Sequence, residues 1–125
     1  MIFGVGTDIV IIARMTNMWE RHGERALERI LAPEERADFR RSTDPGRFLA
    51  KRFAAKEALG KALGTGLRSP VSLSAIAVAH DSQGKPYFRL APDLAAYLAE
   101  RRLTAHLSIS DERDCALAFT VVEQQ

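Results

Sequence analysis

Cysteine is nearly missing from the sequence, because Cys115 is the single one among 125 residues. One cysteine cannot form an intrachain disulfide, and it cannot supply the thiolate cluster that holds a structural zinc ion. Long apolar runs are missing too: no stretch of about 18 apolar residues is free of charge, so no membrane span is expected. The first residues also lack the basic segment of a signal peptide, so we expect a cytoplasmic protein.

The sequence has no large excess of either charge. Lys and Arg number 18 and Asp and Glu number 16, which gives a net charge of +2. Nucleic-acid-binding domains usually carry a clustered basic excess, so this balance weighs against a binder that would use the basic residues from Arg40 to Lys61. Hydrophobic residues make up 46% and charged residues 27%, which is typical of a globular chain of one domain.

The hydrophobic pattern predicts strands near both ends of the chain and helices between them. We expect a strand over 2–12, helices over 13–21, 24–31 and 33–41, and a long helix over 46–63 that ends at Gly64. A strand pair over 72–80 and 87–90, a helix over 92–101, and a strand pair over 105–110 and 115–122 follow. This order predicts an α+β fold, with helices packed on a mainly antiparallel sheet in a single small domain over 1–125.

The first strand carries one carboxylate among apolar residues. Side chains alternate along a strand, so Gly4, Gly6 and Asp8 share one face. A carboxylate flanked by Ile9 and other apolar residues needs a partner, and Mg²⁺ is one candidate because it prefers oxygen ligands. A hydrogen bond to a loop, or an arginine partner, would satisfy Asp8 equally well.

The long helix places a second carboxylate in a small, apolar neighbourhood. At about 100° per residue, Glu57 shares a face with Ala50, Ala54 and Lys61. Such a face would let a strand or a ligand approach closely. The alternative is an ordinary surface pair between Glu57 and Lys61, and the other basic residues could be a charged rim.

Two further segments have polar or basic faces. His106, Ser108 and Ser110 share one face of their strand, which could line a pocket or simply face solvent. The helix after the first strand carries Arg14, Met18, Arg21 and Arg25 at three-to-four spacing, a face that suits an acidic helical partner. A solvated helix is the alternative interpretation, and a non-catalytic module that binds an acidic partner is a further one.

Four motifs occur together, in order, over nearly the whole chain: GVGTDIV at 4–10, RFAAKEALGKALGTG at 52–66, GKP at 84–86 and HLSISD at 106–111. Their combination resembles the small phosphopantetheinyl transferases. The resemblance implies Mg²⁺-dependent transfer of phosphopantetheine from coenzyme A to a serine of an acyl carrier protein, in support of fatty acid biosynthesis. It also implies a homotrimer with active sites between subunits.

The resemblance assigns roles to particular residues. Asp8 and Glu57 would bind Mg²⁺, and Lys61 would act with them in catalysis. The residues on segments that handle coenzyme A in the family are Arg52, Lys56, Lys61, Gly64, Thr65, Gly84, Lys85, Pro86, His106 and Ser108. The carrier would dock on Arg14, Met18, Arg21 and Arg25. Ile11 is a local departure, because family members often carry Glu there.

The implied reaction is displacement at phosphorus, in which the carrier serine attacks the β-phosphate of coenzyme A and adenosine 3′,5′-bisphosphate leaves. Catalysis of this kind depends mainly on positioning and charge neutralisation. Either Glu57 or a water could accept the serine proton.

Overall fold

The computed structural model describes all residues from 1 to 125. Its helices and strands, with η marking short 3₁₀ helices, are β1 (Ile2–Ile11), α1 (Ile12–His22), α2 (Glu24–Ile30), η1 (Pro33–Glu35), α3 (Arg36–Arg41), α4 (Pro45–Leu63), η2 (Leu73–Ala75), β2 (Ile76–His80), β3 (Pro86–Leu90), α5 (Pro92–Glu100), β4 (Leu103–Asp111) and β5 (Cys115–Gln124).

The strands form two antiparallel sheets rather than one. β1, β5 and β4 make a three-stranded sheet with β5 in the middle, and β2 and β3 make a separate hairpin. The register pairs Gly6 with Thr120 and Asp8 with Ala118, so these residues share the inner face of the sheet. The α+β class with helices on antiparallel strands is confirmed.

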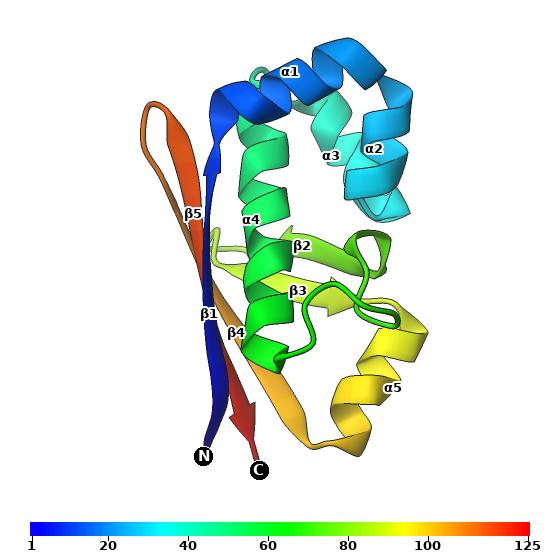
Figure 1. Cartoon of the computed structure of the whole chain (residues 1–125), viewed down its shortest axis with the longest axis vertical. Coiled ribbons are helices and arrows are strands. Elements are labelled where there is room, and N and C mark those ends of the chain that lie inside the picture. Colours follow the sequence, from blue (N-terminus) through cyan, green and yellow to red (C-terminus); the bar gives the residue numbers. More distant parts are fainter.

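Helix α4 lies along the inner face of the three-stranded sheet (Figure 1). The Asp44 side chain accepts a hydrogen bond from the Arg47 amide at its start, and Gly64, at φ +80°, ends it as predicted. Ala54, Ala55 and Ala58 are fully buried, which confirms that the helix is enclosed on more than one side. No helix in the structure is both long and apolar enough to cross a membrane.

The outer face of the same sheet is uncovered, because the helices lie on its other side (Figure 1). Its apolar side chains are well exposed: Val5 is 54% exposed, Ile9 61%, Ile11 54% and Phe119 40%. Isolated exposed apolar residues are ordinary, but neighbours on adjacent strands form a contiguous patch, and such patches mark interaction surfaces.

Two predicted elements differ from the structure. The strand predicted over 72–80 begins only at Ile76, because its partner β3 is five residues long and leaves residues 72–75 without an opposing strand. The helix predicted from Pro33 begins as the 3₁₀ turn η1 and becomes α-helical at Arg36. Residues 72–74, which precede β2, line the candidate site described next.

Candidate functional site

The site begins where β1 and α4 approach each other closely. A Cβ atom at Gly4 would lie 2.0 Å from the Ala62 carbonyl oxygen, and one at Gly6 would lie 2.1 Å from the Ala58 carbonyl oxygen. Only glycine fits at such distances, so the two glycines admit the helix backbone against the strand. Asp8 follows on the same face and therefore lies next to α4.

Asp8 is linked to α4 through Lys61. The Lys61 ammonium donates to Asp8 Oδ1 at 3.1 Å and to the Thr7 carbonyl oxygen at 2.9 Å. The Asp8 side chain is only 17% exposed, whereas that of Lys61 is 53% exposed. Lys61 therefore places a mobile positive charge at the solvent side of a largely enclosed carboxylate.

Glu57 lies close enough to Asp8 for the two carboxylates to interact. Burial raises the pKa of the Glu57 carboxyl above its usual value, and the charge of Asp8 raises it further, while Lys61 and Arg14 oppose the shift. Glu57 is half-buried and one turn before Lys61 on α4. The structure thus brings together the two acids that the sequence singled out.

The donor set fits a magnesium ion. No group of three or more histidine, cysteine or acidic side chains is available as a metal cage, so a binding ion would have two carboxylates at this point. Mg²⁺ is commonly bound by one or two carboxylates and completes its shell with phosphate oxygens and water. A divalent cation would also relieve the mutual repulsion of Asp8 and Glu57.

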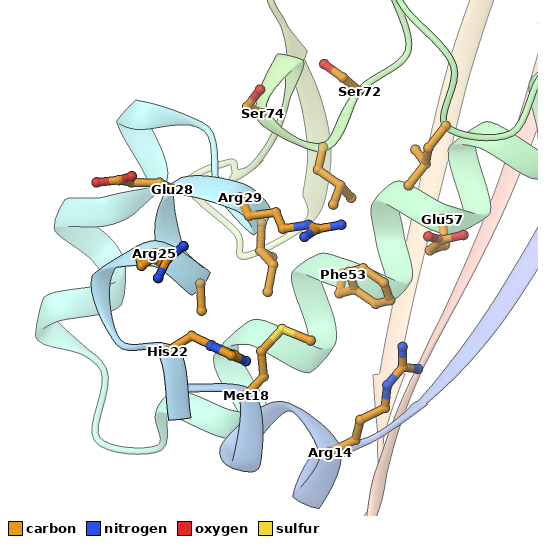
Figure 2. Close-up of a pocket in the computed structure, with 14 residues that line it drawn as sticks. Arg14, Met18, His22, Arg25, Glu28, Arg29, Phe53, Glu57, Ser72 and Ser74 are labelled. Carbon is orange, nitrogen blue, oxygen red and sulfur yellow. The ribbon is translucent and has the colours of Figure 1, made fainter. Parts of the chain in front are cut away.

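Glu57 faces a pocket of about 1060 Å³ between α1, α2, α4 and residues 67–74. Figure 2 shows Met18 and Arg29 extending into it toward Phe53, with Arg14 and Glu57 at one side and Glu28 turned away. The Arg14 guanidinium carbon lies 5.6 Å from the centre of the Phe53 ring. The pocket therefore joins a basic, partly apolar mouth to Glu57, one of the two carboxylates.

The helical face predicted for a partner is only partly present at this pocket. Arg14, Met18 and Arg25 line it, whereas Arg21 is exposed outside it. On α1 the lining continues from Met18 to His22, four residues later, so the neighbouring Arg21 falls beside the lining face. Gly23, at φ +53°, then ends α1, and Arg25 lines the pocket from α2. Sequence reasoning missed His22 and Arg29, both in the lining; treating Arg25 and Arg29 as an i, i+4 pair on a new helix would have found the second.

Lys56, predicted from the resemblance to contact coenzyme A, is buried in this structure and does not line the pocket. Its side chain is 0% exposed, and its ammonium donates to Glu35 Oε1, the Ile30 carbonyl and the Leu73 carbonyl. All three ammonium protons are therefore engaged inside the protein. A step of about 100° separates Lys56 from Glu57 on the helix, so the two cannot share one face.

Arg52 is enclosed in a similar way. Its side chain is 7% exposed, and its guanidinium carbon lies 3.9 Å from the centre of the Phe48 ring. Burial lowers the pKa of Arg52, and the nearby Glu35 charge opposes that change. Within one chain, Arg52 belongs to the core beside Lys56 and reaches neither the pocket nor the surface of the glycine loop.

Apart from Lys61, the remaining predicted coenzyme A contacts lie on three separate surfaces: the end of α4, the turn between β2 and β3, and the outer face of the three-stranded sheet. Gly64 and Thr65 line a second hollow of about 520 Å³ at the end of α4, together with Tyr97. Gly84 and Lys85 lie in the exposed turn between β2 and β3, and Pro86 is the first residue of β3. A single chain does not bring these surfaces together around one ligand.

His106 and Ser108 share one face of β4, as their spacing predicted, and that face is the outer face of the sheet. His106 Nε2 is 2.7 Å from Glu123 Oε1, and the register sets Ser108 opposite the exposed Phe119. This face is the one turned away from α4 and the carboxylate pair. Both residues could therefore join the site only from another copy of the chain.

A family model for the 4′-phosphopantetheinyl transferase superfamily matches residues 4–120, and the chain belongs to this family. It is 61% identical to the holo-[acyl-carrier-protein] synthase of Azoarcus sp. (strain BH72) and 58% identical to that of Dechloromonas aromatica (strain RCB), over 98% of each chain.

Solved structures of the family agree with this assignment. The holo-[acyl-carrier-protein] synthase from Neisseria meningitidis matches with a TM-score of 0.96 and 46% identity, covering 99% of this chain and 100% of that one. The enzyme from Bacillus anthracis, solved in complex with CoA (3′,5′-ADP), matches with a TM-score of 0.83 and 35% identity over 100% and 99% of the two chains.

Proposed function

We propose that the chain transfers the 4′-phosphopantetheine arm of coenzyme A to a serine of an acyl carrier protein, converting apo- to holo-carrier for fatty acid biosynthesis. The observation that carries the proposal is the pair of Asp8 and Glu57 beside a basic pocket, in a chain of this family. The serine oxygen forms a bond to the β-phosphorus of coenzyme A. The bond from that phosphorus to the bridging oxygen breaks, and adenosine 3′,5′-bisphosphate leaves.

The carboxylate pair is assigned to Mg²⁺, with Asp8 and Glu57 as its protein ligands. When bound there, the ion supplies Lewis-acid charge neutralisation for the pyrophosphate. Lys61, which is paired with Asp8 and half-exposed, adds a positive charge that phosphate oxygens can share. The Glu57 carboxylate is the group of this chain that can accept the proton of the attacking serine, with a water molecule as the alternative.

The mouth of the pocket is assigned to the carrier. Arg14, Arg25 and Arg29 surround the apolar side chain of Met18, which is an arrangement that suits an acidic helical surface. Because Glu57 lines the same pocket, a carrier docked at this mouth would have its acceptor serine near the carboxylate pair. Arg21, exposed just beyond the lining, extends the positive surface.

We assign the outer face of the sheet to self-association, as a homotrimer with active sites between subunits. The exposed apolar residues of β1 and β5 support this, since a contact there would remove them from water. A second chain could then bring His106 and Ser108, or the loop at Gly64, to the carboxylate pair of the first. A cytoplasmic location stays a prediction of the sequence.

The decisive experiment is a mass measurement of an apo-carrier incubated with the purified chain, coenzyme A and Mg²⁺. We expect the carrier to gain the mass of one phosphopantetheine, and a carrier whose acceptor serine is alanine to gain none. A chelator should suppress the gain and added Mg²⁺ should restore it. A carrier of unchanged mass under all conditions, with the chain folded, would refute the proposed activity.

A further inference from the structure

Beneath the pocket lies a buried ion pair for which the proposed chemistry has no use. Glu35 is 1% exposed and Lys56 is 0% exposed, and Lys56 Nζ lies 2.5 Å from Glu35 Oε1. The pair is completely satisfied: the ammonium has three acceptors, Glu35 Oε1 also accepts the Ala32 amide at 2.8 Å, and Oε2 accepts the Val78 amide at 2.9 Å.

These hydrogen bonds join α4 to four other segments. The Ile30 carbonyl, bonded at 2.7 Å, closes α2, and the Leu73 carbonyl, bonded at 3.1 Å, belongs to η2. The Ala32 amide precedes η1, and the Val78 amide lies in the middle of β2. One pair of side chains therefore fixes where α2 and η2 stand relative to α4.

The two segments held in this way are walls of the pocket. Ile30 and Leu73 both line it, and Glu57, which also lines it, is the next residue after Lys56 on α4. The helical turn that carries Glu57 therefore also carries the side chain, Lys56, that is bonded to the pocket walls at Ile30 and Leu73. A shift of Lys56 or Glu35 would move Ile30 and Leu73 without touching the carboxylate pair.

Stability alone is a poor explanation for this arrangement. Removing two charges from water carries a penalty that their attraction only partly offsets, and well-packed apolar residues of similar volume often serve as well or better. Directional hydrogen bonds to two wall carbonyls, by contrast, are something that an apolar pair cannot supply. The geometry of the pair therefore points to orientation.

We propose that Glu35 and Lys56 are positioning residues, which hold the Ile30 and Leu73 walls of the pocket in register with Glu57. The inference rests on the transfer reaction proposed above, in which the carrier serine and the pantetheine arm meet at that pocket. It assigns the pair an effect on turnover that exceeds its effect on folding.

The test uses the double variant Lys56→Met/Glu35→Met in the full chain, because Glu35→Met alone leaves the Lys56 ammonium buried without a counter-charge. The double change still removes the counter-charge of Arg52, which lies 3.6 Å from Glu35, and the acceptor of the Ala32 and Val78 amides. We therefore expect the double variant to unfold roughly 10 °C below the parent chain, and turnover is compared at a temperature where both proteins are folded. We expect its turnover number to fall roughly 10- to 100-fold, since misplacement by about 1 Å has effects of that order. The KM for coenzyme A should change much less.

A matched control is Arg40→Met/Glu24→Met, which removes an exposed ion pair between α3 and α2 that lies outside the pocket. It deletes the same number of charges and should leave turnover unchanged. A double variant at Lys56 and Glu35 that is folded at the assay temperature and turns over like the parent would overturn the inference, while the transfer activity would stand.

Amide hydrogen exchange gives a readout that does not need transfer. In the double variant, peptides covering 29–34 and 71–76 should exchange faster than in the parent, while peptides of β5 should not. Unchanged exchange in both wall peptides would refute the positioning role. If the parent chain transferred nothing, the proposed function would fail, and the exchange data would still decide whether the pair holds the walls.

Discussion

Replacing Gly6 by alanine should separate the two carboxylates of the site. Gly6 faces α4, and a Cβ atom there would lie 2.1 Å from the Ala58 carbonyl oxygen and 2.7 Å from the Ala62 amide nitrogen. Real Cβ atoms essentially never come within 3.0 Å of such atoms, so the strand and the helix must separate by about 0.9 Å. Asp8 lies two residues further along the strand, and Glu57 immediately precedes Ala58.

Two opposing effects decide the expected stability. Alanine restricts the unfolded chain and so favours folding by about 0.4–1 kcal/mol, because Gly6 does not need a positive φ. Overpacking in a well-packed core costs about 1–3 kcal/mol. The close atoms belong to the helix backbone, which cannot move aside like the end of a flexible side chain. The free energy of unfolding should therefore fall by about 1–2 kcal/mol. A displacement near 1 Å should also lower transfer by roughly 100-fold.

The assay combines thermal unfolding with calorimetric titration of Mg²⁺ and the carrier mass measurement. Ala96→Gly is the control: it lies in the middle of α5 on an exposed face and should cost about 1 kcal/mol of stability without touching the site. We expect Mg²⁺ affinity to fall only in the Gly6 variant. The reasoning is refuted if that variant melts, binds Mg²⁺ and transfers like the parent chain.

Four further substitutions test the metal ligands, the carrier-docking mouth and the outer sheet face. Asp8→Ala or Glu57→Ala should abolish Mg²⁺-dependent transfer in a chain that still folds, as followed by mass and thermal unfolding; full activity in either would overturn the metal assignment. Arg14→Glu should raise the KM for the carrier at least about tenfold more than that for coenzyme A, as expected for a lost charge pair at an interface, and equal changes would argue against docking at this mouth. Ile9→Asp, on the exposed sheet face, should reduce the mass in sedimentation to that of one chain, and an unchanged mass would exclude this face as the contact.

Periodicity singled out Asp8 and Glu57 one by one, but their pairing was implied by the family resemblance. Alternation along a strand puts Gly4, Gly6 and Asp8 on one face, and the helical repeat puts small residues around Glu57. Neither pattern contains the distance between strand and helix. That distance follows from the glycines, which exclude side chains where the helix backbone passes.

Periodicity could not predict the burial of Arg52 and Lys56, which the family resemblance had assigned to coenzyme A. A sequence gives the angle of a residue around a helix, but the depth of its side chain depends on which segments pack beside it. Here α2, η1 and η2 close over α4 and supply Glu35 and two carbonyls as internal partners. No local signal in the residues around Lys56 identifies a partner 21 positions away.

The sheet itself separates two groups of predicted site residues. Asp8 and Glu57 lie on its inner side, whereas His106 lies on its outer side, where it contacts Glu123. Moving His106 inward would require a one-residue slip of β4, which would also turn the buried Leu107 outward. If His106 takes part in transfer, it must do so at the carboxylate pair of a neighbouring chain.

Mixing two defective chains tests this requirement directly. Asp8→Ala removes a carboxylate from the inner side of a chain, and His106→Ala removes the imidazole from its outer side. Each protein alone should therefore have little activity. After dissociation and reassembly in equal amounts, about one interface in four should pair an intact inner side with an intact outer side. Transfer should then rise well above that of either variant to about a quarter of the parent rate. A mixture no more active than its components, despite exchange of subunits shown by mass, would place His106 outside the reaction.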